Sequence, residues 1–240
     1  MFKSKIIDTF PAFEAFWEQV KDQSIDIQLG EWKSGYLAGW PELLEMQIRS
    51  YTEDGEDWRQ VALERIVPFW QARLPSMRCA HEILMIVCDP VCQSAQKRLG
   101  YRQPLSFVLY VGVGCGAGWA TTYENKAAIL LGLENIAEEG WETEGVLRGL
   151  LAHEIGNLWH IEQRKRSGLE KGVGPWWQLY TEGLAQRCER EVSGEGSWHM
   201  ASGKLGWLEW CQAEKQWLAE EYLRRVALGG RCASIFWFMV

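Results

Sequence analysis

Several features that would place this chain in a membrane or on a nucleic acid are missing from its sequence. No uncharged apolar run reaches the roughly 18 residues needed to span a bilayer. The stretch Met1–Asp8 has no apolar core of the kind found in a signal peptide. The formal net charge is −7, whereas phosphate binding needs a basic face. We therefore expect a cytoplasmic protein that binds neither membrane nor nucleic acid.

Paired cysteines are also missing. The 7 cysteines are an odd number without a C-x-x-C pair, which favours reduced thiols over a disulfide framework or a cysteine zinc site. The other proportions, 47% hydrophobic and 24% charged among 240 residues, are typical of a globular protein. We expect one compact unit, in which a helix-rich region at 1–100 packs on a core at 101–240. The 15 tryptophans are interpreted as core and groove-lining residues rather than as a ligand cage.

The first hundred residues carry mainly helical patterns. Apolar residues recur at helical spacing over Ile6–Val20 and over Trp58–Gln71, and a third helix is expected at Pro41–Ser50. Pro11 should start or kink a turn in the first of these segments. The apolar run His81–Cys88 fits a buried strand, although periodicity alone does not separate it from a helix.

The centre of the chain is rich in strand-forming residues. Three strands are predicted, at Leu105–Val111, Trp119–Tyr123 and Ala127–Leu133, and glycines break the pattern after the first. These glycines lack the G-x-G-x-x-G order before a helix, so a phosphate-binding loop is disfavoured. The apolar segment Ser234–Val240 is predicted to be a packed terminal strand. The fold class is therefore α+β, with a small mixed sheet that leads into a helix and a helix-rich remainder.

A helix predicted over Thr143–Arg166 carries the most informative motif, L-L-A-H-E-I-G-N-L-W-H at Leu150–His160. In the zinc-protease motif H-E-x-x-H, two histidines one helical turn apart hold the metal, and the glutamate activates the attacking water. Here His153 and Glu154 match the first two positions, and Asn157 stands where the second histidine is expected. Glu154 is therefore the candidate general base and His153 a candidate metal ligand.

A second helix, predicted over Pro175–Val192, carries the segment Y-T-E-G-L-A with Glu182 at its centre. If the two helices form a hairpin, Glu182 would reach the motif helix and add a carboxylate ligand. Gly183 and Ala185 are small, so we expect them to let the two helices approach closely. One further long helix is predicted over about 206–227.

These two segments resemble the gluzincin class of zinc metallopeptidases, in which an H-E-x-x-H helix is joined by a glutamate from a later helix. The resemblance covers about residues 105–192, and it extends to uncharacterised bacterial predicted zinc proteases with an E-G-L-A segment. It implies a zincin-like fold, a Zn²⁺ cofactor, and hydrolysis of peptide bonds in a peptide or protein substrate. It also implies that a strand before the motif helix pairs with the substrate backbone, and Ala127–Leu133 is the matching candidate.

The departure at Asn157 leaves the ligand set open. An amide oxygen is a weaker zinc ligand than imidazole. His160 could substitute because seven residues are nearly two helical turns, but it lies about 10 Å along the axis from His153. The candidate ligands are therefore His153 and Glu182, joined by Asn157 or His160.

Each remaining histidine has a functional and a structural interpretation. His199 could stabilise an oxyanion, although a histidine in a surface loop is the simpler interpretation. His81 is interpreted as part of the fold, and Tyr180, close to Glu182, as a packing residue.

Two functions remain open from the sequence. The first is an active zinc metallopeptidase, which the presence of both Glu154 and Glu182 favours because buried carboxylates without a partner are costly. The second is an inactive relative that keeps the fold and binds a peptide or protein partner, which Asn157 favours. A purely structural helical protein would require both motif segments to be accidental.

Overall fold

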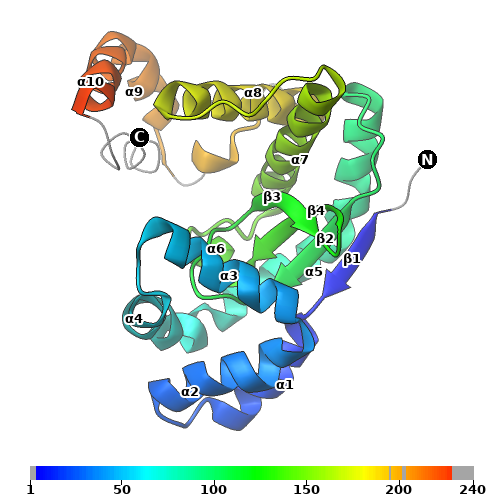
Figure 1. Ribbon diagram of the computed structural model, residues 1–240, viewed down its shortest axis with the longest axis vertical. Coiled ribbons are helices and arrows are strands. Elements are labelled where there is room, and N and C mark those ends of the chain that lie inside the picture. The colour runs from blue at the N-terminus through cyan, green and yellow to red at the C-terminus, as the bar shows by residue number, and fades with distance from the viewer. Residues whose placement is uncertain (1–3, 195, 202–203, 229–240) are drawn as a thin grey trace.

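The structure, a computed structural model, describes residues 4–194, 196–201 and 204–228. A sheet of four strands lies at its centre (Figure 1). The strands are β1 (Lys5–Asp8), β2 (Ser106–Tyr110), β3 (Trp119–Tyr123) and β4 (Lys126–Gly132). They are ordered β1-β2-β4-β3, with β1, β2 and β4 parallel and β3 antiparallel to β4. A small mixed sheet in a helix-rich chain confirms the predicted α+β class.

Strands β3 and β4 form a hairpin whose turn residues are Glu124 and Asn125. Both have positive φ, 49° and 58°, as a two-residue hairpin turn of the type I′ kind requires. Because β4 lies between β2 and β3, both of its edges are already paired. The expectation that Ala127–Leu133 offers its edge to a substrate is therefore wrong. Among the described residues, β3 is the strand beside the motif helix that has an unpaired edge.

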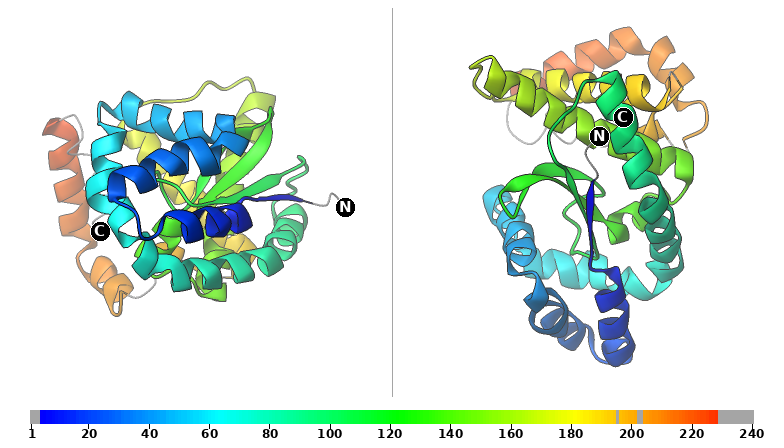
Figure 2. Two further views of the ribbon diagram at one scale, coloured as in Figure 1. Left: turned by 90° about the horizontal axis from the view of Figure 1, so that it is seen from below. Right: turned by 90° about the vertical axis from the view of Figure 1, so that its right-hand side faces the viewer.

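The region before residue 70 is mostly helical, and its helices lie below the sheet in the view of Figure 1 and in the right-hand view of Figure 2. Its elements are α1 (Phe10–Val20), α2 (Ile25–Glu31), η1 (Trp32–Tyr36), η2 (Leu37–Gly39), α3 (Pro41–Asp54), α4 (Trp58–Val61), η3 (Ala62–Ile66) and η4 (Val67–Phe69). Helix α1 begins at Phe10, not near Ile6, because Pro11 suits the first helical turn. The residues before it form β1, which joins the sheet.

Helix α5 (Trp70–Arg98) corrects two expectations. The apolar run His81–Cys88 lies inside it and is no strand. Its buried residues recur at helical spacing, whereas Ile86 within the same run is 70% exposed. The helix predicted over Trp58–Gln71 is broken into α4, η3, η4 and the start of α5, at a point where Pro68 lacks an N–H for the helical ladder.

The predicted motif helix and its successor are confirmed. Helix α7 (Glu144–Arg166) follows the short α6 (Leu133–Glu138), and α8 (Pro175–Ser193) begins with its proline in the first turn. The helix expected at 206–227 is two helices, α9 (Trp207–Ala213) and α10 (Lys215–Leu228). None of the helices in the described ranges is long and apolar enough to cross a membrane. The predicted strand Ser234–Val240 lies outside the described residues.

Helix α7 lies between the sheet and two other helices, and this position buries the motif residues. This helix contacts β3 and β4 on one side and runs against α8 and α5 on the others. Its residues are therefore mostly buried, including His153, Glu154 and His160. The same hydrophobic core continues into the N-terminal helices, where Phe13 packs against Tyr36 and Trp70.

A candidate metal centre between helices α7 and α8

Close contact between α7 and α8 depends on glycines of α7, of which Gly156 lies against the α8 backbone. A Cβ at Gly156 would lie 2.6 Å from Cβ of Cys188 and 3.4 Å from Cα of Ala185. Any larger residue at position 156 would push the helices apart. By contrast, a Cβ at Gly183 would meet nothing within 4 Å. The expectation that Gly183 allows the approach is therefore wrong, while Ala185 does lie at the contact.

This contact brings the two motif segments together. Nε2 of His153, on α7, lies 3.2 Å from Oε2 of Glu182, on α8. The His153 side chain is almost fully buried, whereas 40% of the Glu182 side chain is exposed. The pair therefore has an inner member fixed by packing and an outer member that solvent reaches.

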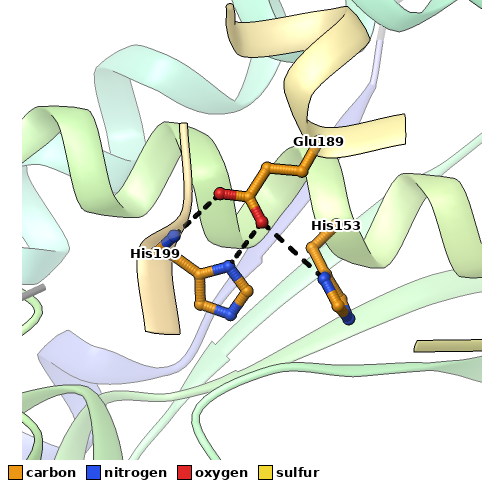
Figure 3. Close-up of side chains that lie close together, drawn as sticks. All are labelled: His153, Glu189 and His199. Atoms are coloured by element: carbon orange, nitrogen blue, oxygen red, sulfur yellow. Dashed lines mark hydrogen bonds and ion pairs between the residues drawn. The ribbon is translucent and has the colours of Figure 1, made fainter. Parts of the chain in front are cut away.

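A second carboxylate lies on the other side of the same imidazole (Figure 3). Oε2 of Glu189 is 3.7 Å from Nδ1 of His153, which is longer than a hydrogen bond, and 2.8 Å from Nδ1 of His199. Oε1 of Glu189 accepts bonds from the backbone N–H of His199 at 2.8 Å and from Oγ of Ser197 at 2.9 Å. Glu189 is fully buried, holds His199 by two hydrogen bonds and faces Nδ1 of His153 without bonding it.

The charges of this cluster depend on one another. Burial alone would lower the pKa of His153. The bond to Glu182 and the nearby carboxylates of Glu189 and Glu154 instead raise this pKa to about 10. Burial alone would raise the pKa of Glu189, but the two imidazoles and the backbone N–H of His199 hold it well below its usual range. The cluster thus carries negative charge in excess, which favours a cation.

Glu154 points toward the sheet. Its Oε2 accepts the backbone N–H of Ala120 at 3.0 Å. Because the two-residue turn makes Tyr123 and Lys126 the closing pair of the hairpin, the N–H of Ala120 faces the open edge of β3. A Cβ at Gly118 would lie 3.0 Å from Glu154 Cγ and 2.8 Å from a methyl group of Leu150, so this glycine lets the start of β3 approach α7.

The two candidates for the third ligand lie elsewhere on α7. Nδ2 of Asn157 is 3.4 Å from Oε2 of Glu154, so its amide is directed at the candidate base. The His160 ring packs on Trp177 and Tyr180, with ring centres 5.6 and 5.3 Å apart. Burial lowers the pKa of His160, so it is neutral. Among the described residues, no hydrogen bond or ion pair joins His160 to His153 or Glu182.

The remaining predicted residues have structural settings. His81 pairs with Asp8 at 2.9 Å and packs on Phe10, far along the chain from the motif. His199 is 4% exposed and belongs to the buried cluster, so the expectation of a surface-loop histidine is wrong. Sequence reasoning missed Glu189. Glu189 lies seven residues after Glu182. Seven residues are about two helical turns, so this spacing alone could have placed both side chains on the same face of the helix.

The donor set fits a zinc ion. With ligand distances near 2.0 Å, two ligand atoms of a tetrahedral zinc site lie about 3.3 Å apart. The 3.2 Å between His153 Nε2 and Glu182 Oε2 agrees with that separation. The buried group His153, Glu189 and His199 also has potential ligand atoms within 4.8 Å of one another. His153 belongs to both arrangements through different nitrogens.

Comparisons with other proteins add no assignment. No protein-family model, curated protein or solved structure matches this chain.

Proposed function

We propose that the protein is a zinc-dependent metallopeptidase of the zincin-like kind, acting on a peptide or protein substrate. The observation that carries this proposal is the 3.2 Å approach of His153 Nε2 and Glu182 Oε2 across two helices. The two residues are 29 positions apart in the sequence (182 − 153), and the resemblance to gluzincins names both as ligands.

The surrounding charges support a divalent cation at this place. Three carboxylates, from Glu154, Glu182 and Glu189, act on His153 and favour its positive form. A zinc ion would replace the proton at Nε2 and relieve the same excess of negative charge. When bound, zinc supplies Lewis acidity, which makes a water molecule acidic near neutral pH and polarises a peptide carbonyl.

The residues of the chain supply the other parts of the chemistry. Glu154 is the proton acceptor, and its carboxylate lies at the open edge of β3 through its bond to Ala120. An extended peptide that pairs with this edge would pass beside Glu154. Glu189 bonds the His199 ring and faces the His153 ring, and Glu182, the more exposed ligand, lies on the solvent side of His153.

The test compares zinc content and peptide hydrolysis in three variants. Wild-type protein should hold about one zinc per chain and cleave unstructured peptides. Glu182→Ala should lose the zinc, while Glu191→Ala, an exposed glutamate on the same helix, should keep it. Glu154→Gln should keep the zinc and lose at least about a hundredfold in cleavage, as loss of a general base does. A wild-type protein without zinc, even after incubation with it, would refute the proposal.

A second function is favoured by one contact. The Asn157 amide faces Glu154 at 3.4 Å and takes the place of the second motif imidazole. An inactive relative that binds an extended peptide at β3 without cleaving it would have this arrangement. Such a protein would bind the peptides that it fails to hydrolyse. Asn157→His restores the H-E-x-x-H pattern and should raise zinc affinity on the order of tenfold or more. If that variant alone cleaves peptides, the wild-type chain is the inactive form.

A further inference from the structure

The proposed zinc site needs a third strong protein ligand, since zinc sites of this class use three. Among the described residues, neither candidate on α7 makes a hydrogen bond or ion pair with His153 or Glu182. Asn157 directs its amide nitrogen at Glu154, and His160 packs on the rings of Trp177 and Tyr180. A histidine from another element beside His153 is the alternative.

We infer that His199 is this ligand, through its Nε2, and that Glu189 is a positioning residue that orients both imidazoles from outside the site. The inference rests on the proposed function and completes its ligand set as His153 Nε2, His199 Nε2 and Glu182. The second imidazole of the motif helix is thus replaced by a histidine from the short helix η5 (His199–Ala201), 46 residues after His153 (199 − 153).

Hydrogen bonding fixes which nitrogen of His199 is available. Its Nδ1 lies 2.8 Å from Oε2 of Glu189, and an ionised carboxylate can only accept, so Nδ1 carries the proton. In the neutral ring, Nε2 then has a free lone pair. Among the described residues, no hydrogen bond reaches Nε2 of His199. Nε2 of His199 is therefore the nitrogen of this ring that can bind a metal.

The ring geometry agrees with two imidazoles on one ion. The ring centres of His153 and His199 are 5.0 Å apart and their planes differ by 76°. Two imidazoles bound through nitrogen at about 2.0 Å to a tetrahedral zinc have ring centres about 5 Å apart. Figure 3 shows Nδ1 of both rings facing Glu189 and Nε2 of both rings on the opposite side. The Nε2 atoms of both rings, of which that of His153 pairs with Glu182, are therefore directed to the side away from Glu189.

Glu189 has the contacts of an outer carboxylate. Its two oxygens already accept bonds from Ser197 Oγ, from the backbone N–H of His199 and from the His199 ring. Metal-bound histidines commonly direct their other nitrogen to such a carboxylate, which fixes the ring orientation. A rival arrangement would use Glu189 itself as ligand, together with the Nδ1 atoms of both rings. That arrangement breaks the 2.8 Å bond to His199 and leaves Glu182 unused.

The experiment measures zinc stoichiometry and affinity in full-length variants. His199→Asn is the main variant because the asparagine amide takes the place of Nδ1 and keeps a donor for Glu189 while Nε2 is lost. Asn157→Ala is its matched control, and Glu182→Gln separates the two arrangements. Thermal melting of each variant without added zinc shows whether it folds. X-ray absorption of the wild-type zinc complex counts the imidazole ligands.

The expected results differ for the two arrangements. Zinc affinity should fall in His199→Asn by more than about 100-fold, the upper limit for loss of an outer partner. It should fall strongly in Glu182→Gln, stay near wild type in Asn157→Ala, and the absorption spectrum should show two imidazoles.

Four results would overturn the inference. Wild-type zinc affinity in a folded His199→Asn would leave the proposed function intact but show that His199 is not a ligand. A single imidazole in the absorption spectrum would show the same. Wild-type affinity in Glu182→Gln would favour the arrangement with Glu189 as ligand. A wild-type chain that binds no zinc would refute both the inference and the proposed function.

Discussion

Two buried glutamates of this protein, Glu189 and Glu134, have opposite charge preferences. Both are 0% exposed. Glu189 receives bonds from Ser197 Oγ and from both the backbone and the ring of His199, and its pKa lies well below its usual range. Its negative charge is therefore stable inside the protein.

Glu134 lies at the start of α6, beneath the glycine-rich loop at 112–118. Burial raises its pKa from 4.5 to about 7, and the backbone N–H groups of Gly112 and Gly114 offset this only in part. Its Oε1 accepts from Gly114 at 3.2 Å, while its Oε2 has no hydrogen-bond partner among the described residues. The comparison shows that donors, and not depth of burial, decide whether a carboxylate is ionised here.

The largest effect is expected from removing the ionised member of this comparison. Glu189→Ala would leave the backbone N–H and imidazole of His199 and the Ser197 hydroxyl without their shared acceptor, and it would remove the carboxylate that faces His153. Breaking a buried charge pair in this way costs about 3–5 kcal/mol. We expect the free energy of unfolding in urea to fall by that amount, and Glu191→Ala to stay close to wild type. Equal stability of the two variants would show that Glu189 is not stabilised by its donors.

Glu134→Gln should reveal the opposite behaviour through pH. Because the folded-state pKa is raised, the contribution of Glu134 to stability is complete below pH 4.5 and is lost as pH rises through about 7. This loss is worth roughly 3 kcal/mol. Relative to wild type, Glu134→Gln should therefore gain stability between pH 4.5 and 8, measured by urea unfolding at several pH values. The exposed Glu139→Gln should show no such change. If the difference in stability between Glu134→Gln and wild type does not vary with pH, the raised pKa of Glu134 is contradicted.

A smaller effect is expected where the helices that hold Glu189 and His153 meet. Gly156→Ala places a methyl group 2.6 Å from Cβ of Cys188 and should destabilise the protein by about 1–3 kcal/mol. Gly183→Ala meets open space and should stabilise α8 by about 0.5–1 kcal/mol. Thermal melting would compare the two substitutions. Opposite signs are expected, and a stable Gly156→Ala would show that the helices can separate without loss.

Local patterns in the sequence predict the central elements well. The strands near 106–132, the helix ending at Arg166 and the helix starting at Pro175 all have clear boundary residues. The sequence does not identify the run His81–Cys88 as helical, because a short apolar stretch fits a buried strand and a buried helix equally well. The run is helical as part of the 29-residue helix α5.

The residues of the site also differ in whether local sequence patterns identify them. The motif letters identify His153, Glu154 and Glu182 because their spacing on helices is regular. The sequence does not predict the hydrogen bond between His199 and Glu189, since this bond depends on how the chain turns back after α8. The edge role of β3 likewise depends on sheet order, which the pattern of single strands does not contain.

The bond between Glu154 and Ala120 has a consequence for self-association. An open strand edge can pair with a strand of another molecule, which leads to aggregation. At β3, the carboxylate of Glu154 covers one of the outward N–H groups and adds a negative charge to the edge. An incoming strand must first displace it. The residue proposed as the general base therefore also caps part of the edge at which any added strand, a substrate peptide included, would pair.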